Sequence, residues 1–122
     1  MMLYLDNAAT TLKKPLSVYA TLFKSTLFSG GNAGRGGHKM SMDAVRAIVD
    51  TQDLIAQLFN IKKAENVVFT QNATYALNTA ILGTMSNGGH IVVTEMDHNS
   101  VLRPACLPDN YTVVKADKSG YV

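Results

Sequence analysis

Two short polar clusters in the sequence have residue types that could do chemistry. The first, Gln71 to Thr74, follows the apolar run Val67 to Phe69 and precedes an amphipathic run. If the amphipathic run is a helix, its first turn has unpaired backbone N–H groups and a partial positive charge, which suit an anion such as phosphate. Asn72 could cap this helix, and Thr74 could add a hydroxyl donor. On the chemistry of this junction alone, ordinary capping by Asn72 is favoured over an anion site.

The second cluster, TEMDHNS at residues 94–100, places Glu95, Asp97 and His98 after another apolar run. A histidine beside two carboxylates could bind a metal, transfer protons or act as a stacking platform. The other two histidines do not have metal-ligand spacing with it, so no metal site is predicted. The structural alternative is that Asp97 or Asn99 caps the next helix and leaves His98 half exposed.

A glycine-rich loop, SGGNAGRGG at residues 29–37, raises the possibility of a nucleotide-binding loop. From Gly31 the spacing reaches Gly36, but a Gly-His pair follows where a P-loop needs Lys-Ser or Lys-Thr. The loop also follows a predicted helix rather than a strand. A flexible connection between helices explains it, although Arg35 and His38 leave a binding role open.

Helical periodicity precedes and follows this loop. Apolar spacing predicts a helix over 16–27, with Pro15 in its first turn. A second helix is predicted from a Ser41 cap to about Asn60, with Asp43 at the positive end of its dipole. These helices and the loop form a predicted N-terminal segment, residues 1–62.

From residue 63 onward the pattern changes to an α/β domain. Apolar, β-branched strands alternate with helices, in the order 66–71 (strand), 73–84 (helix), 90–96 (strand), 99–107 (helix) and 111–116 (strand). The predicted fold class is therefore α/β, a helical segment followed by the βαβαβ start of a mainly parallel sheet. Both polar clusters follow strands, and ligands bind beyond the carboxyl ends of such strands.

A sheet that stopped after residue 116 would leave an apolar edge unpaired, which natural proteins avoid. We therefore expect residues 63–122 to be the truncated start of a larger domain, and the chain to be a fragment of a longer protein. The alternative is a small complete domain whose edges pair in an oligomer.

The composition narrows the class of protein. The chain has 122 residues, is 47% hydrophobic and carries a net charge of +2, which does not favour nucleic-acid or anionic-membrane partners. It has no predicted signal peptide or membrane span, so a cytoplasmic location is expected. The single cysteine, Cys106, is predicted to be buried within a helix rather than catalytic.

Several motifs occur together in one order: YLDNAATT, NAGRGGHKMS, LFN, VVFTQNATYALNTAI, EMDHNSVLRP and VVKADKSGYV. In this order they resemble the N-terminal part of class V aminotransferases, of the cysteine desulfurase and selenocysteine lyase type. The resemblance implies the type I fold of enzymes that use pyridoxal 5′-phosphate (PLP). It further implies that Asn72, Ala73 and Thr74 hold the cofactor phosphate, and that His98 stacks on the pyridine ring and assists proton transfer.

The resemblance also implies a substrate side. The loop with Asn7, Ala8 and Ala9 should lie near an amino-acid substrate, and the segment from Arg35 to His38 should line the site close to a homodimer partner. A sulfur-acceptor protein is a further implied partner. No nucleic acid or membrane is expected.

Other groups of the family are expected only in later segments. These are the lysine that holds the cofactor, the aspartate that pairs with its ring nitrogen and the cysteine that carries sulfur. His38-Lys39 is in the wrong order to supply that lysine, and Cys106 does not match the sulfur carrier. The hypothesis is thus the N-terminal portion of an enzyme that removes sulfur or selenium from a cysteine-type amino acid to give alanine, inactive by itself.

Three alternatives stay open beside this hypothesis. The parent protein could be a class V aminotransferase or another PLP lyase. The chain could be a truncated, non-catalytic binding or dimerisation module. An unrelated nucleotide-binding βαβ domain is disfavoured, because both glycine fingerprints are missing.

Overall fold

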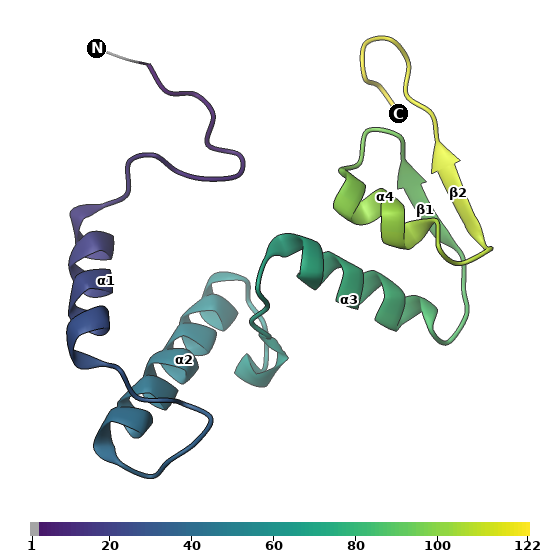
Figure 1. Cartoon of the computed structure of the whole chain (residues 1–122). Coiled ribbons are helices and arrows are strands. Elements are labelled where there is room, and N and C mark those ends of the chain that lie inside the picture. The colour runs from purple at the N-terminus through teal and green to yellow at the C-terminus, as the bar shows by residue number, and fades with distance from the viewer. Residues whose placement is uncertain (1–2) are drawn as a thin grey trace. The chain divides into compact units, whose positions relative to one another are not determined.

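A computed structural model describes residues 3–122, and residue contacts divide the chain into two compact units (Figure 1). The first unit ends at Val67 and the second begins at Val68. The domain boundary predicted between residues 62 and 63 stays a prediction.

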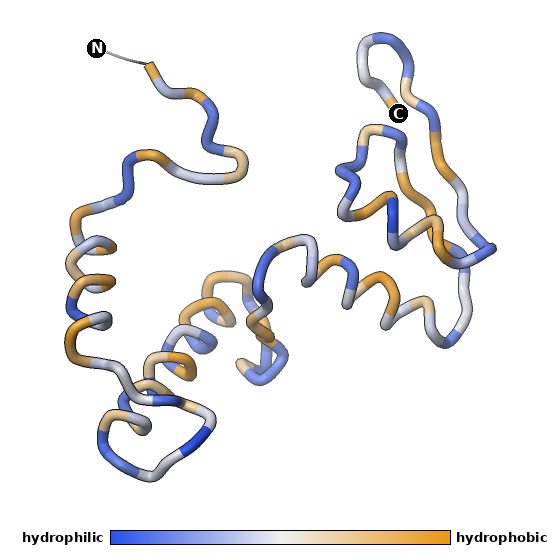
Figure 2. Tube along the Cα trace, viewed as in Figure 1, coloured by the Kyte–Doolittle hydropathy of each residue, from blue (hydrophilic) through white to orange (hydrophobic). Residues whose placement is uncertain are grey.

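Helix α1, Leu16–Phe28, agrees with the predicted range. Pro15 precedes it at the N-cap position, with its carbonyl oxygen accepting from the Val18 N–H at 3.0 Å. No residue of α1 is buried, and Leu16 and Phe23 are 85% and 68% exposed. Along α1, apolar segments alternate with polar ones in Figure 2.

Helix α2, Lys39–Leu58, begins before the predicted cap. His38 is the N-cap residue, because its Nδ1 accepts from the Ser41 N–H at 3.4 Å. The prediction that Ser41 caps this helix is therefore wrong. Ser41 lies inside the first turn, fully buried, and its hydroxyl donates to the Arg35 carbonyl oxygen at 3.4 Å. Asp43 pairs with Lys39, one turn before it, at 2.8 Å.

The C-terminal half of α2 packs against a 3₁₀ turn, η1, Ala64–Asn66. Ala56 and Val67 are the buried apolar side chains here. Gln52 Nε2 donates to the Val67 carbonyl oxygen at 2.7 Å, which holds the chain against α2 just after η1.

The second unit contains α3, β1, α4 and β2, whose bounds are Ala73–Met85, Ile91–Thr94, Asn99–Ala105 and Tyr111–Val114. β1 and β2 pair in parallel, from Ile91 opposite Tyr111 to Thr94 opposite Val114. Helix α4 connects these strands and packs on both β1 and α3 (Figure 1). Val93, Pro104 and Ala105 form the buried centre of this unit. The parallel β–α–β arrangement predicted for residues 90–116 is confirmed.

The strand predicted over 66–71 is wrong. Asn66 ends η1, and residues 67–70 belong to no strand. Val67 has extended backbone angles, φ −89° and ψ 112°, but the sheet of the described residues contains only β1 and β2. A β-strand is defined by its hydrogen-bonded neighbour, and residues 67–70 have none here. The predicted βαβαβ start is reduced to βαβ.

Cys106 also departs from its prediction. It is exposed and follows the last residue of α4 as the C-cap, so it is neither buried nor within the helix. Pro104 lies inside α4 and cannot donate to the Ser100 carbonyl oxygen, because it lacks a backbone N–H, whereas the Cys106 N–H still donates to the Leu102 carbonyl oxygen at 3.0 Å.

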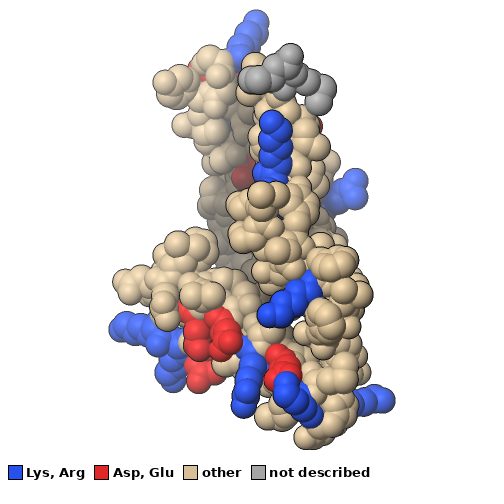
Figure 3. Space-filling model, turned by 90° about the vertical axis from the view of Figure 1, so that its left-hand side faces the viewer, with Lys and Arg blue, Asp and Glu red and all other residues tan. Residues whose placement is uncertain are grey.

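Charged side chains of both signs are interspersed on the mainly uncharged face seen in Figure 3. Over residues 3–122, none of the helices has the length and hydropathy required of a membrane span.

Candidate functional site

The start of α3 is fixed by Asn72. Its Oδ1 accepts from the Tyr75 N–H at 2.8 Å, and its carbonyl oxygen accepts from the Ala76 N–H at 3.1 Å. The Thr70 hydroxyl donates to the same carbonyl oxygen at 3.0 Å. The predicted cap is therefore confirmed, and it satisfies one of the four N–H groups that a helix start leaves unpaired.

Other donors remain unpaired at this helix start. Within residues 3–122, the N–H groups of Ala73 and Thr74 and the Thr74 hydroxyl make no hydrogen bond. Later in α3, by contrast, the Thr79 hydroxyl donates to the Tyr75 carbonyl oxygen at 2.9 Å. A residue in the first turn has no helical carbonyl one turn earlier, so the Thr74 hydroxyl stays available at the positive end of the helix.

The two carboxylates of the second cluster bind backbone groups. Asp97 Oδ2 accepts from the Thr94 N–H at 2.8 Å and from its hydroxyl at 3.1 Å. Glu95 Oε1 accepts from the Ala116 N–H at 2.7 Å, beside the end of β2. Both carboxylates thus stabilise the turn after β1. No group of three or more potential ligand side chains that could hold a metal ion occurs among the described residues.

His98 is the N-cap residue of α4. Its Nδ1 accepts from the Ser100 N–H at 3.1 Å and lies 2.9 Å from the Ser100 hydroxyl oxygen. The alternative in which Asp97 or Asn99 caps this helix is therefore wrong. The ring is anchored at one nitrogen, while the His98 side chain remains exposed.

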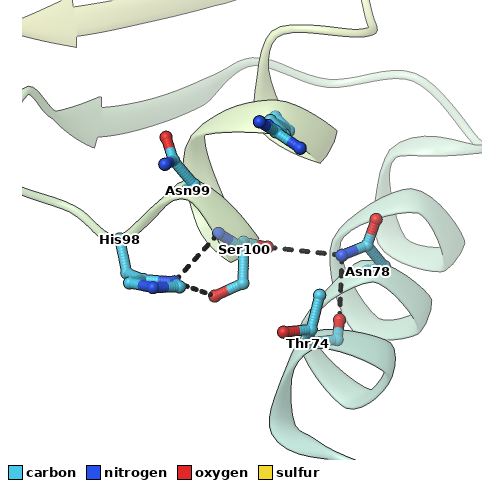
Figure 4. A pocket seen from close by; sticks show the side chains of 6 residues that line it. Thr74, Asn78, His98, Asn99 and Ser100 are labelled. Carbon is cyan, nitrogen blue, oxygen red and sulfur yellow. Dashed lines mark hydrogen bonds between the residues drawn. The ribbon is translucent and has the colours of Figure 1, made fainter.

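Helices α3 and α4 bring the two clusters together. Asn78 Nδ2 donates to the Thr74 carbonyl oxygen at 2.8 Å and to the Ser100 carbonyl oxygen, on α4, at 3.4 Å. Between the helices lies a pocket of about 370 Å³ (Figure 4), lined by Thr74, Asn78, His98, Asn99, Ser100 and Arg103. A pocket of this volume is large enough for a small cofactor.

Two of these lining residues, Asn78 and Arg103, lie outside both predicted clusters, and Asn99 and Ser100 lie within the second cluster but were given no role in binding a ligand. Helical spacing in the sequence could have indicated Asn78 and Arg103. Asn78 follows Thr74 by four residues, and Arg103 follows Asn99 by four, so each pair shares a helix face. Arg103 adds a cation to the same pocket as the free donors of Thr74.

The predicted substrate residues belong to the first unit. Asn7, Ala8 and Ala9 lie in an exposed, irregular segment. The Arg35 side chain is exposed, whereas the His38 ring is engaged with Ser41, its Nε2 lying 3.1 Å from the hydroxyl oxygen. The substrate role of all five residues stays a prediction.

Comparison with known proteins identifies the family. The family model described as Aminotransferase class-V matches residues 3–119. The chain belongs to the class-V aminotransferase family. The N-terminal motifs that resemble this family are thus part of a match over nearly the whole chain.

Three curated relatives of this class-V aminotransferase chain are described as probable cysteine desulfurase. The protein from Aeropyrum pernix is 40% identical over 105 residues, which cover 83% of this chain and 25% of that protein. The proteins from Synechocystis sp. and Treponema pallidum are 33% and 31% identical, over 84% and 83% of this chain and 25% and 26% of their own lengths. The chain therefore spans about a quarter of the length of these relatives.

Proposed function

We propose that this chain is the N-terminal part of a PLP-dependent cysteine desulfurase-like enzyme with the type I fold. The observation that supports this function best is the meeting of Thr74 and His98 at one pocket, with the free donors at the start of α3 beside it. The family match and the names of the relatives agree with it. The parent enzyme would take sulfur or selenium from a cysteine-type amino acid and leave alanine.

The chemistry of the donors fits the phosphate of PLP. Two backbone N–H groups, the Thr74 hydroxyl and the positive end of α3 can all bind a phosphate dianion. Asn72 contributes by capping, since it fixes the direction of the N–H groups that follow it. Arg103 supplies a positive charge on the opposite helix.

The remaining residues fit the ring of the cofactor. The exposed His98 ring is held at Nδ1, so a flat aromatic group could stack on its face. When bound, PLP supplies an electron sink for bonds at the substrate α-carbon and beyond it. This chain's residues would bind the phosphate, orient the ring and leave one histidine nitrogen free beside it.

Residues Asn7, Ala8, Ala9, Arg35 and His38 are proposed to shape the substrate side, with a homodimer partner nearby. We propose that the chain is inactive alone, because the covalent lysine and the sulfur-carrying cysteine of the family match later segments. A sulfur-acceptor protein would then interact with the whole enzyme.

Binding of PLP to the 122-residue chain tests this function. Equilibrium dialysis should show weak binding that inorganic phosphate reverses. Hydrogen bonds to charged groups contribute about 1.5–3 kcal/mol, so we expect Thr74→Val to weaken binding by roughly 10- to 100-fold. Thr79→Val is the matched control, because its hydroxyl is already bonded within α3.

Equal loss of affinity in both threonine variants would contradict the phosphate site, since Thr74 lines the pocket and Thr79 does not. Binding that phosphate does not reverse would contradict it as well. Tighter binding of a dinucleotide than of PLP would instead support the nucleotide-binding alternative.

A further inference from the structure

Two donors of Ser100 point to one nitrogen of His98. The Ser100 N–H lies 3.1 Å from Nδ1, and the Ser100 hydroxyl oxygen lies 2.9 Å from it (Figure 4). A backbone N–H can only donate, so Nδ1 must be the acceptor and cannot carry a proton. The hydroxyl then donates to the same nitrogen. In the neutral ring the proton is therefore on Nε2.

Ser100 is itself held in place. It is only 8% exposed, and the next turn of α4 contains the buried residues Pro104 and Ala105. Its carbonyl oxygen accepts from Asn78 Nδ2, and the same amide also donates to the Thr74 carbonyl oxygen. The position of Ser100 is thus tied to the first turn of α3.

We propose that Ser100 is a positioning residue that holds His98 as its Nε2–H tautomer. The Nε2–H group is then the one polar group of the ring that is free to face a bound molecule, and it acts as a donor. A proton placed on Nδ1 would break the hydrogen bond from the Ser100 N–H, and the Ser100 hydroxyl could then only accept. A catalytic use of the Nε2–H group rests on the proposed function, whereas the tautomer of the His98 ring does not depend on it.

His90 provides an internal reference with the opposite tautomer. Asn110 Nδ2 donates to the Gly89 carbonyl oxygen at 2.7 Å, which directs Asn110 Oδ1 toward His90 Nδ1. An amide oxygen only accepts, so His90 Nδ1 must carry the proton. The Thr112 hydroxyl, 2.8 Å from Nε2, can donate to that nitrogen.

Long-range ¹H–¹⁵N NMR of the whole chain, labelled with ¹⁵N-histidine, tests the proposal without any ligand. The spectra are recorded at alkaline pH, at which a free imidazole is neutral. We expect the His98 signals of an unprotonated Nδ1 and a protonated Nε2, and the reverse pattern for His90. A protonated Nδ1 in His98, or averaged signals for its two nitrogens, would overturn the proposal.

Variants of Ser100 separate positioning from folding. Ser100→Ala removes one of the two donors, so the two His98 nitrogen signals should move toward each other while those of His90 stay unchanged. Ser100→Thr should restore the original pattern, because it keeps the hydroxyl. Ser86→Ala is the control, since its hydroxyl donates to the Gly83 carbonyl oxygen at 2.7 Å.

Unchanged His98 signals in Ser100→Ala would overturn the positioning role. If that variant unfolds, the His90 pattern is lost too, and the wild-type and Ser100→Thr spectra decide the proposal. A chain with the expected tautomers that fails to bind PLP would contradict the proposed function and leave this inference intact.

Discussion

At the scale of single residues, Asn72 and Thr74 have complementary positions at the start of α3. Asn72 satisfies the Tyr75 N–H, and Thr74 leaves its hydroxyl unpaired within residues 3–122. Helix capping and anion binding are alternative explanations of the polar residues at 71–74 in the sequence. In the structure the two roles are compatible. A cap uses one N–H group and leaves earlier ones for a ligand.

Removal of the Asn72 cap should destabilise the second unit. We expect Asn72→Ala to lower the free energy of unfolding by about 1 kcal/mol, the usual cost of losing an N-cap side chain. Urea unfolding followed by far-UV circular dichroism measures this change. Asn87→Ala is the control, because the Asn87 side chain makes no hydrogen bond among the described residues. Equal effects of the two substitutions would contradict the capping role.

Asp117 gives a prediction for pH. The Ser119 hydroxyl, followed by the Tyr121 and Ser119 N–H groups, lowers the pKa of Asp117 below 3.8. Because the pKa of Asp117 is lower in the folded chain than in the unfolded chain, the ionised carboxylate stabilises the fold. This contribution is complete above about pH 3.8, and it is lost as the pH falls through the folded-state pKa of Asp117. An NMR titration of the carboxyl carbon should show this midpoint.

Ser119→Ala should move the Asp117 midpoint upward, toward 3.8, since it removes the largest cause of the shift. The control is again Ser86→Ala, which should leave the midpoint unchanged. A midpoint in Ser119→Ala equal to that of the wild type would show that the hydroxyl is not responsible.

At the scale of the elements, histidines are the N-cap residues of two helices for which other residues were predicted as caps. His38 caps α2 and His98 caps α4, each through Nδ1. Ser, Thr, Asp and Asn are the preferred N-cap residues, so a neighbouring residue of these types is the natural prediction. In each helix the serine two or three positions later donates its N–H to the ring instead.

The glycine-rich loop is tightly packed at one position. A Cβ on Gly31 would clash with the carbonyl carbon and oxygen of Met40, whereas one on Gly37 would meet nothing within 4 Å. We expect Gly31→Ala to destabilise the first unit by roughly 1–3 kcal/mol through overpacking. Gly37→Ala should be neutral or slightly stabilising, because it reduces the entropy of the unfolded chain.

Thermal unfolding followed by circular dichroism compares these two variants. Equal melting temperatures would mean that the loop yields at Gly31, and would contradict the close approach. A loss confined to Gly31→Ala would show that the loop is not merely a flexible connection between helices.

At the scale of the whole molecule, the exposed apolar surface favours self-association. Helix α1 has no buried residue, although its apolar side chains recur at helical spacing. Sedimentation velocity should therefore detect species larger than a monomer. The paired substitution Leu16→Lys and Phe23→Glu should reduce them, whereas Thr21→Lys with Ser25→Glu, which places the same charges on polar positions, should have less effect. A stable, well-folded monomer would contradict this expectation.

The chain spans about a quarter of the relatives' length, and covalent attachment of the cofactor is proposed to need a later lysine. We expect borohydride reduction of the chain with PLP to give no adduct concentrated at one lysine. Peptide mass spectrometry measures the distribution, and free lysine mixed with PLP is the positive control. A single strongly labelled lysine would show that the chain already contains the attachment group.

Much of the candidate site could be predicted because it depends on neighbours in the chain. The Asn72 cap, helix α3 and the parallel strands β1 and β2 follow from local hydrogen bonding and from apolar periodicity. The order of short motifs also determined the family, which the match over residues 3–119 confirms. Both polar clusters were expected beyond the ends of strands, but only the second follows a strand of the described residues, and the packing of α3 on α4 brings the first cluster to it.

Tertiary packing decided the contacts between helices and which extended segments pair as strands. The Asn78 contact with Ser100 joins residues 22 positions apart, so it exists only when α3 lies against α4. Residues 67–70 have the apolar pattern of a strand, but a strand needs a paired neighbour that the described residues do not provide. By itself the sequence determined which residues could do chemistry. The packing of α4 on α3 determined that Thr74 and His98 meet at one pocket, where Ser100 is bonded to Asn78.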